Sequence, residues 1–193
     1  MVSKSIEEIF LNERTCYNFA DVPVSDDLLK EIYDIMKMGP TSANGCPLRI
    51  AFVKTPESKE KLISCAMEGN VANIKAAPVT AIFAYDMKFY DKLPELFPHN
   101  PGIKGYFSSS ESVVIENALR NSSLQAAYFM IVARAKGLSC SPMGGFDSAK
   151  LNQTFFPDGN YRVNFICNLG YRSKEEIHPR LPRLSFEDCC RFV

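Results

Sequence analysis

Apolar positions recur at every third or fourth residue in three stretches of the chain, a spacing that predicts helices. The first stretch follows a capping pair, Ser5 and Glu8, and ends near Asn12. The second begins at Ser25, carries acidic residues in its first turn and stops at a Gly-Pro pair. The third is a long helix over residues 111–136, whose many small side chains permit close approach of another helix.

Shorter apolar runs predict the remaining regular elements. Residues 49–54, 79–85 and 162–169 have the composition of strands, and 79–85 is apolar enough for a strand buried on both faces. Proline near the start of 56–67 and the pattern of 148–155 predict two further helices. Helices and strands are therefore interspersed along the chain.

Two segments lack a periodic pattern. Residues 89–110 combine prolines and glycines with several aromatic residues, which is typical either of a lid over a site or of a loop packed on the surface. Residues 141–145 (SPMGG) predict a turn with an exposed backbone. Since no repeat or linker divides the chain, we expect a single domain over residues 1–193.

Charge and hydropathy argue against several classes of protein. Lys and Arg together number 22, as do Asp and Glu, so no net positive field would attract nucleic acid. The longest apolar run, residues 124–135, is interrupted by Gln125 and Arg134 and is shorter than the roughly 20 residues of a membrane span. Charged residues near the N-terminus leave no apolar stretch for a secretory signal. We therefore expect a cytoplasmic protein with neither nucleic acid nor a membrane as a partner.

The cysteines and histidines give no sign of a disulfide framework or a metal site. The seven cysteines are unevenly spaced without a CxxC pair, and the two histidines have no Cys or His at metal-ligand spacing. We expect reduced thiols and no metal. The nucleotide-binding patterns GxGxxG and GxxxxGK[ST] and the hydrolase pattern GxSxG are also absent from the sequence.

Three polar turns remain as candidate sites: residues 13–19 (ERTCYNF), 39–47 (GPTSANGCP) and 141–145. Each turn alone is more typical of a solvated loop than of a binding site. Taken in order with a C-terminal PRL, however, they resemble the flavin-binding pattern of the nitroreductase superfamily over nearly the whole chain. The phrases LPELFPH and RNSSLQAAYF are most similar to its malonic semialdehyde reductase branch.

The resemblance implies an α+β fold of nitroreductase type, in which a mixed, mostly antiparallel sheet forms the middle of a three-layer α-β-α sandwich. It also implies an intertwined homodimer with FMN at the subunit interface, where both chains line each site. The long helix over 111–136, with its small residues, would suit such an interface.

The same resemblance assigns residues to parts of the FMN site. A guanidinium group suits a phosphate because its planar fork donates two hydrogen bonds. The residues expected at the phosphate are Arg14, Thr15, Cys16 and Arg183, with Arg180 as a further candidate. Those expected around the flavin ring are Asn18, Thr41, Ser42, Asn44, Asn70, Met143, Gly144 and Gly145. Candidates for substrate contact are Tyr90, Tyr106 and Phe107, with packing as the alternative role of each.

The implied activity is transfer of hydride from NADH or NADPH through flavin N5 to a small acceptor, such as malonic semialdehyde (3-oxopropanoate), a nitro compound or a quinone. Because the cofactor does the chemistry, we expect no side chain to act as catalytic acid or base. Two alternatives remain open at this point: a flavin-binding protein for storage or sensing with little turnover, and a dimer without a cofactor. Nothing in the chain selects NADH over NADPH.

Overall fold

The computed structural model describes residues 4–173 and 179–193. Within them, four strands form one sheet in the order β1-β2-β4-β3, and every neighbouring pair is antiparallel. The strands are β1 (Leu48–Val53), β2 (Val79–Asp86), β3 (Ser139–Met143) and β4 (Tyr161–Gly170). The sheet was expected to be mixed, but no parallel pair occurs among these strands.

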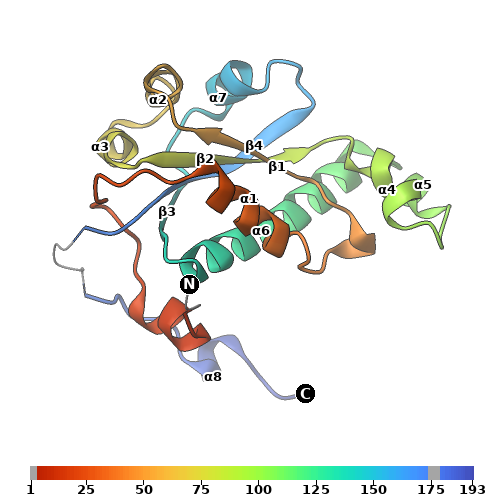
Figure 1. Ribbon diagram of the computed structural model, residues 1–193. Helices are drawn as coiled ribbons and strands as arrows, with labels where there is room; N and C mark the ends of the chain where they lie inside the picture. Colours follow the sequence, from red (N-terminus) through yellow and green to blue (C-terminus); the bar gives the residue numbers. More distant parts are fainter. Residues whose placement is uncertain (1–3, 174–178) are drawn as a thin grey trace.

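Helices cover both faces of the sheet, as Figure 1 shows. One layer consists of α1 (Asp26–Met36) and the long α6 (Glu111–Ala135). The opposite layer consists of α2 (Pro56–Ile63), α3 (Glu68–Ala76) and α7 (Ser148–Phe155). The predicted three-layer α-β-α architecture is therefore confirmed.

The core consists of two apolar layers, one on each face of the sheet. Phe83 of β2 faces α6, where its ring meets that of Phe129 at a centroid distance of 5.5 Å. Its neighbour Ile82 points the opposite way, toward Leu62 and Leu151 of the other helix layer. Successive side chains of a strand alternate between its faces, so an uninterrupted apolar run is what a strand covered on both sides requires.

Local capping explains where the predicted helices begin. The Ser25 hydroxyl accepts a hydrogen bond from the N–H of Leu28 (3.2 Å) at the start of α1. The predicted Ser5–Glu8 capping pair is also present, with both reciprocal bonds made. Each bond satisfies an N–H that the first turn of a helix leaves without a partner. The helix that follows ends in a π-helical turn, η1 (Glu8–Asn12).

The segment predicted to be rich in loops is instead folded into short helices, which corrects that expectation. Residues 89–107 form η3 (Phe89–Lys92), α4 (Leu93–Leu96) and α5 (Ile103–Phe107). Their apolar side chains make a third cluster against the first half of α6, including Phe89, Leu93 and Val114. The aromatic residues that made a plain linker improbable thus form a small core of their own.

Two further predictions about elements were wrong. Residues 141–143 of the SPMGG segment belong to β3, an edge strand in which the exposed Pro142 is tolerated. The helix predicted over 56–67 ends at Ile63, and α3 follows as a separate, unpredicted helix. A last helical turn, α8 (Phe186–Cys189), lies in the C-terminal tail, where no element was predicted.

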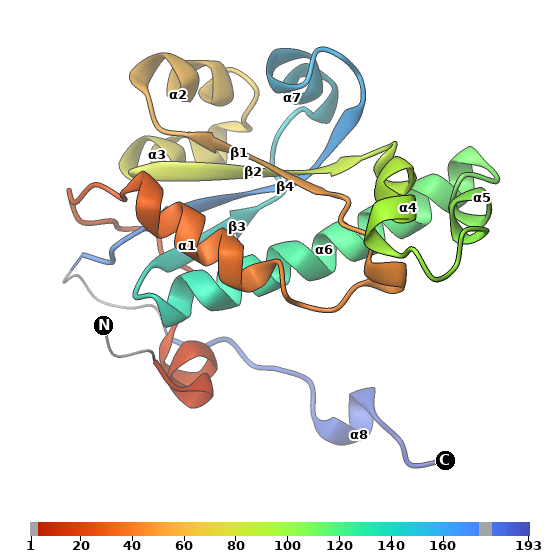
Figure 2. The same cartoon turned by 45° about the vertical axis from the view of Figure 1, so that its right-hand side comes forward.

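The C-terminal arm, residues 179–193, runs away from the body of the protein (Figure 2). Its root is fixed by Arg180, whose guanidinium donates hydrogen bonds of 2.6 Å to the carbonyls of Phe10 and Leu11. Beyond that point its apolar side chains are exposed: Leu184 is 74 % and Phe186 52 % accessible. Among the described residues, no helix has the length and apolarity to cross a membrane.

Candidate functional site

Two adjoining hollows open where the loop after η1 passes β3 and α3. The ring hollow has a volume of about 510 Å³ and the arginine hollow about 670 Å³. Thr15 and Tyr17 line both, so the two hollows adjoin at these side chains, and together they are called the groove below. Tyr17 was not among the predicted site residues, because an aromatic residue in a polar loop gives no sign of its direction.

The ring hollow contains four of the predicted flavin contacts: Asn70, Met143, Gly144 and Gly145. Asn70 donates a hydrogen bond from Nδ2 to the carbonyl of Gly145 (2.9 Å), which also accepts from the N–H of Met67 (3.0 Å). A methyl group at position 145 would lie only 2.5 Å from Asn70 Nδ2, whereas one at position 144 would meet open space. A side chain at position 145 would therefore displace the Asn70 amide from this turn, whereas one at position 144 would not.

The arginine hollow brings together the guanidinium groups of Arg14, Arg134, Arg180 and Arg183. Three of them were predicted, and here Arg14 and Arg183 line one hollow within a single chain. The Nε atoms of Arg14 and Arg134 are buried and have no hydrogen-bond partner among residues 4–173 and 179–193. Buried donors without acceptors are costly, so this set suits an anionic ligand.

The acidic residue at this hollow is already engaged. Glu13 pairs with Lys4 and with Arg172. Burial raises the pKa of the Glu13 carboxyl, but the hydrogen bonds and charges of Lys4 and Arg172 outweigh burial and leave its pKa below the usual value. Glu13 therefore remains ionised within its own ion pairs, and the charge of the four arginines is left for another partner.

Cys16 and Asn18 do not line the groove, contrary to expectation. The Cys16 side chain is fully buried and its thiol donates to the carbonyl of Asn18 (3.3 Å). Burial raises the pKa of this thiol, which keeps it protonated. The Cys16 side chain lines neither hollow, and its hydrogen bond to the Asn18 carbonyl holds the loop in shape instead. Asn18 is exposed on the same loop, outside both hollows.

The predicted turn with Thr41, Ser42 and Asn44 forms η2 (Ser42–Asn44) and contacts the middle of α6, away from Arg134 in its last turn. Asn121 of α6 accepts a hydrogen bond from the N–H of Ser42 (2.8 Å), and Asn44 donates to a carbonyl of α4. Asn121 and Arg134 are separated by about 20 Å along the helix axis. In one chain, therefore, this turn does not reach the groove.

The backbone of this turn is strained. Ala43 and Asn44 have φ angles of 50° and 54°, a region that residues other than glycine adopt at a cost. Such strain persists only where surrounding contacts impose it, and it is concentrated at functional sites. The 41–44 turn therefore remains a candidate for one half of a binding site.

Of the three candidates for substrate contact, Phe107 and Tyr90 belong to the third apolar cluster, which also contacts Ala43 of this turn. Phe107 is 4 % exposed and packs against Phe89 with ring centroids 5.6 Å apart, so it has a packing role. Tyr90 is half-buried against the same ring. Tyr106 is 61 % exposed, which leaves it free to meet another molecule.

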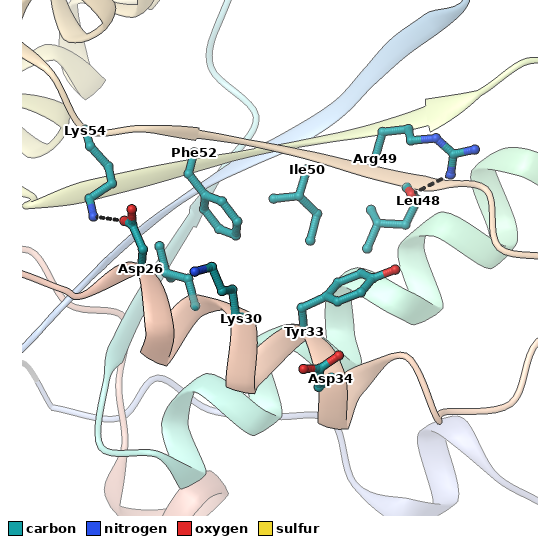
Figure 3. Close-up of a pocket in the computed structure, with 10 residues that line it drawn as sticks. Asp26, Lys30, Tyr33, Asp34, Leu48, Arg49, Ile50, Phe52 and Lys54 are labelled. Atoms are coloured by element: carbon teal, nitrogen blue, oxygen red, sulfur yellow. Dashed lines mark hydrogen bonds and ion pairs between the residues drawn. The ribbon is translucent and has the colours of Figure 1, made fainter.

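A third hollow, the edge groove, lies between α1 and β1 (Figure 3) and has a volume of about 860 Å³. Leu48, Ile50 and Phe52 project from β1 toward Tyr33 of α1, while charged side chains, including the Asp26–Lys54 ion pair, stand around them. β1 is at the edge of the sheet and pairs on one side with β2. None of the predicted site residues lines this groove.

Comparison with known proteins identifies the family. A family model described as the Nitroreductase family matches residues 11–171. The chain belongs to the nitroreductase family. Among its relatives, a Ralstonia nicotianae protein provisionally named an NADH dehydrogenase/NAD(P)H nitroreductase is 49 % identical over 97 % of this chain and 96 % of its own. A similarly named Polynucleobacter asymbioticus protein is 47 % identical over 98 % and 96 %.

Solved nitroreductase structures share the fold. A nitroreductase from Exiguobacterium sibiricum, crystallised in complex with FMN, superposes with a TM-score of 0.90 at 22 % identity, covering 100 % of this chain and 99 % of its own. A Staphylococcus epidermidis protein described provisionally as an NAD(P)H:FMN oxidoreductase gives 0.86 at 21 % identity, covering 100 % and 98 %. At these identities the likeness establishes architecture, which agrees with the predicted nitroreductase-type sandwich.

Proposed function

We propose that this member of the nitroreductase family binds FMN in the groove and transfers hydride from NADH or NADPH to a small acceptor. The observation that carries the proposal is the set of guanidinium groups in the arginine hollow, which continues into the glycine-lined ring hollow. When bound, FMN supplies the redox chemistry, accepting hydride at N5 and passing it on. The role of the protein is to bind the flavin, orient it and shield it.

The residues present fit the cofactor part by part. Arg14, Arg180 and Arg183 offer planar donors for a phosphate dianion, and two buried Nε atoms lack a protein acceptor among the described residues. Thr15 and Tyr17 would flank the ribityl chain, since they line both hollows. Asn70 and the 143–145 turn would border the flavin ring, where glycine allows the ring to approach the backbone.

A second copy of the chain would complete the site. The strained 41–44 turn lies outside the groove of its own chain, so it would line the flavin of a partner, as the family resemblance implied. The exposed C-terminal arm supplies a way to hold such a partner. We place its apolar side chains in the partner's edge groove, because that groove presents apolar side chains beside a strand edge.

The test is spectroscopic. The purified protein should be yellow. Anaerobic addition of NADH or NADPH should bleach the flavin absorption band within seconds of mixing. Malonic semialdehyde, a nitroaromatic compound and a quinone are then titrated as oxidants, and recovery of the band identifies the acceptor class. Flavin that neither nucleotide reduces would indicate storage or sensing, and a colourless protein that takes up no FMN would exclude the proposal.

A further inference from the structure

Arg134 differs from the other arginines of the arginine hollow in what holds it. It lies in the last turn of α6, a helix of 25 residues packed against the sheet. Arg14 lies in a loop, and Arg180 and Arg183 lie in the C-terminal arm. The position of Arg134 is therefore set by the rigid core of the protein, and cations are favoured at this end of a helix.

Its guanidinium is incompletely satisfied by the protein. Nη1 donates a long hydrogen bond of 3.5 Å to the carbonyl of Ile9, and the buried Nε has no partner in the described part of the chain. Nor does Arg134 form an ion pair with a described acidic residue. A group held this way has donors left for a ligand.

The four guanidinium groups also repel one another. Burial first, and then the charges of Arg14, Arg183 and Arg134, hold the pKa of Arg180 below its usual value. Glu13 relieves little of this repulsion, because Lys4 and Arg172 occupy its carboxylate. An anion bound among the four guanidinium groups would relieve this repulsion.

We propose that Arg134 is a binding residue for a phosphate monoester dianion and provides this hollow with a cation anchored in the core of the fold. This inference rests on the proposed function and extends it by assigning to phosphate binding a residue on the long helix. A bound phosphate would supply an acceptor for the guanidinium donors that the described residues leave unpaired.

The experiment compares Arg134→Ala with wild type for two ligands that differ only in the phosphate, FMN and riboflavin. The dissociation constants are measured by quenching of flavin fluorescence in the apoprotein. We expect the variant to bind FMN about tenfold to a hundredfold more weakly, because a charge-assisted hydrogen bond is lost, and riboflavin as wild type does. Its FMN affinity should also depend less on ionic strength.

Arg120→Ala is the matched control. Arg120 lies on the same helix and carries the same charge, but it is exposed and paired with Glu116. This variant should bind both flavins as wild type does. Arg134→Lys should recover part of the lost FMN affinity, because it restores the charge without the planar fork.

The outcomes separate the inference from the function on which it rests. Wild-type protein that prefers FMN to riboflavin, with the same preference in Arg134→Ala, would overturn the role of Arg134 and leave the proposed function standing. Equal loss of both flavins with a lowered melting temperature would show a structural role and overturn it as well. Wild-type protein that binds no FMN would overturn both.

Discussion

At the scale of single residues, alanine substitutions at two adjacent glycines should affect FMN binding differently. Gly145→Ala places a methyl group against Asn70 Nδ2 and displaces the side chain that borders the ring hollow. We expect a loss of about 1 kcal/mol from that hydrogen bond and FMN affinity lower by roughly fivefold to tenfold. Fluorescence titration with FMN measures the affinity, and thermal unfolding measures the stability.

Gly144→Ala is the control for this prediction, since its methyl group would meet nothing within 4 Å. Neither glycine has a positive φ, so alanine strains the backbone at neither position. If both variants bind FMN equally well, Asn70 does not border the flavin.

The positions of several candidate site residues followed from the family resemblance. Asn70 of α3 and Gly145 of the turn after β3 both line the groove, next to the place that the resemblance implied for the flavin. Cys16 was misplaced because its motif neighbours face the groove while its own side chain faces the core. Arg134 was overlooked because it belongs to no motif: it stood out only as a charge interrupting an apolar run.

At the scale of elements, α6 joins the sheet to the site through buried polar groups. Gln125, the other interruption in that apolar run, accepts a hydrogen bond from the N–H of Leu48 (3.0 Å) at the start of β1. Gln125 is buried, so its amide oxygen takes the place of the water molecule that would otherwise accept the hydrogen bond of the Leu48 N–H.

Gln125→Leu should therefore destabilise the protein by about 1–3 kcal/mol, because it leaves the buried N–H of Leu48 without an acceptor. Denaturant unfolding measures the loss. Gln153→Leu makes the same change at an exposed position of α7 and should have little effect. Equal stability of the two variants would contradict the role of the Leu48 hydrogen bond.

Elements with a strong local signal were predicted nearly to the residue. Both α1 and α7 begin at side-chain caps, β2 is apolar enough to be recognised as a buried strand, and β4 has the composition of a strand. A local sequence pattern was missing from α3, in which Ile74 alone is fully buried. It was also missing from β3, where Pro142 is typical of a turn. In these two cases tertiary contacts, rather than local periodicity, decide the structure.

At the scale of the whole molecule, we expect the C-terminal arm to determine whether the protein is a monomer or a dimer in solution. Leu184→Asp combined with Phe186→Asp should lower the molar mass in solution from twice 21.6 kDa to 21.6 kDa, as measured by light scattering. Both side chains are exposed in the chain itself, so the variant should keep its fold. The two aspartates would place charge in the partner's edge groove, and the burial of apolar side chains that holds the arm there would be lost.

Ile50→Asp, on the opposite side of the same proposed contact, should have the same effect, whereas Gln153→Asp on α7 should leave the mass unchanged. A dimer that persists in both the arm and the groove variants would place the contact between subunits elsewhere.

The length of α6 has a consequence for how the chain can change. One rigid helix holds Asn121 near its middle and Arg134 in its last turn, so it fixes the spacing between the 41–44 turn and the arginine hollow. Each residue inserted or deleted between them would rotate one relative to the other by about 100° and move it by about 1.5 Å. An insertion in this part of the helix would therefore disturb both regions, whereas a surface connection such as the one between α4 and α5 would accept one more readily.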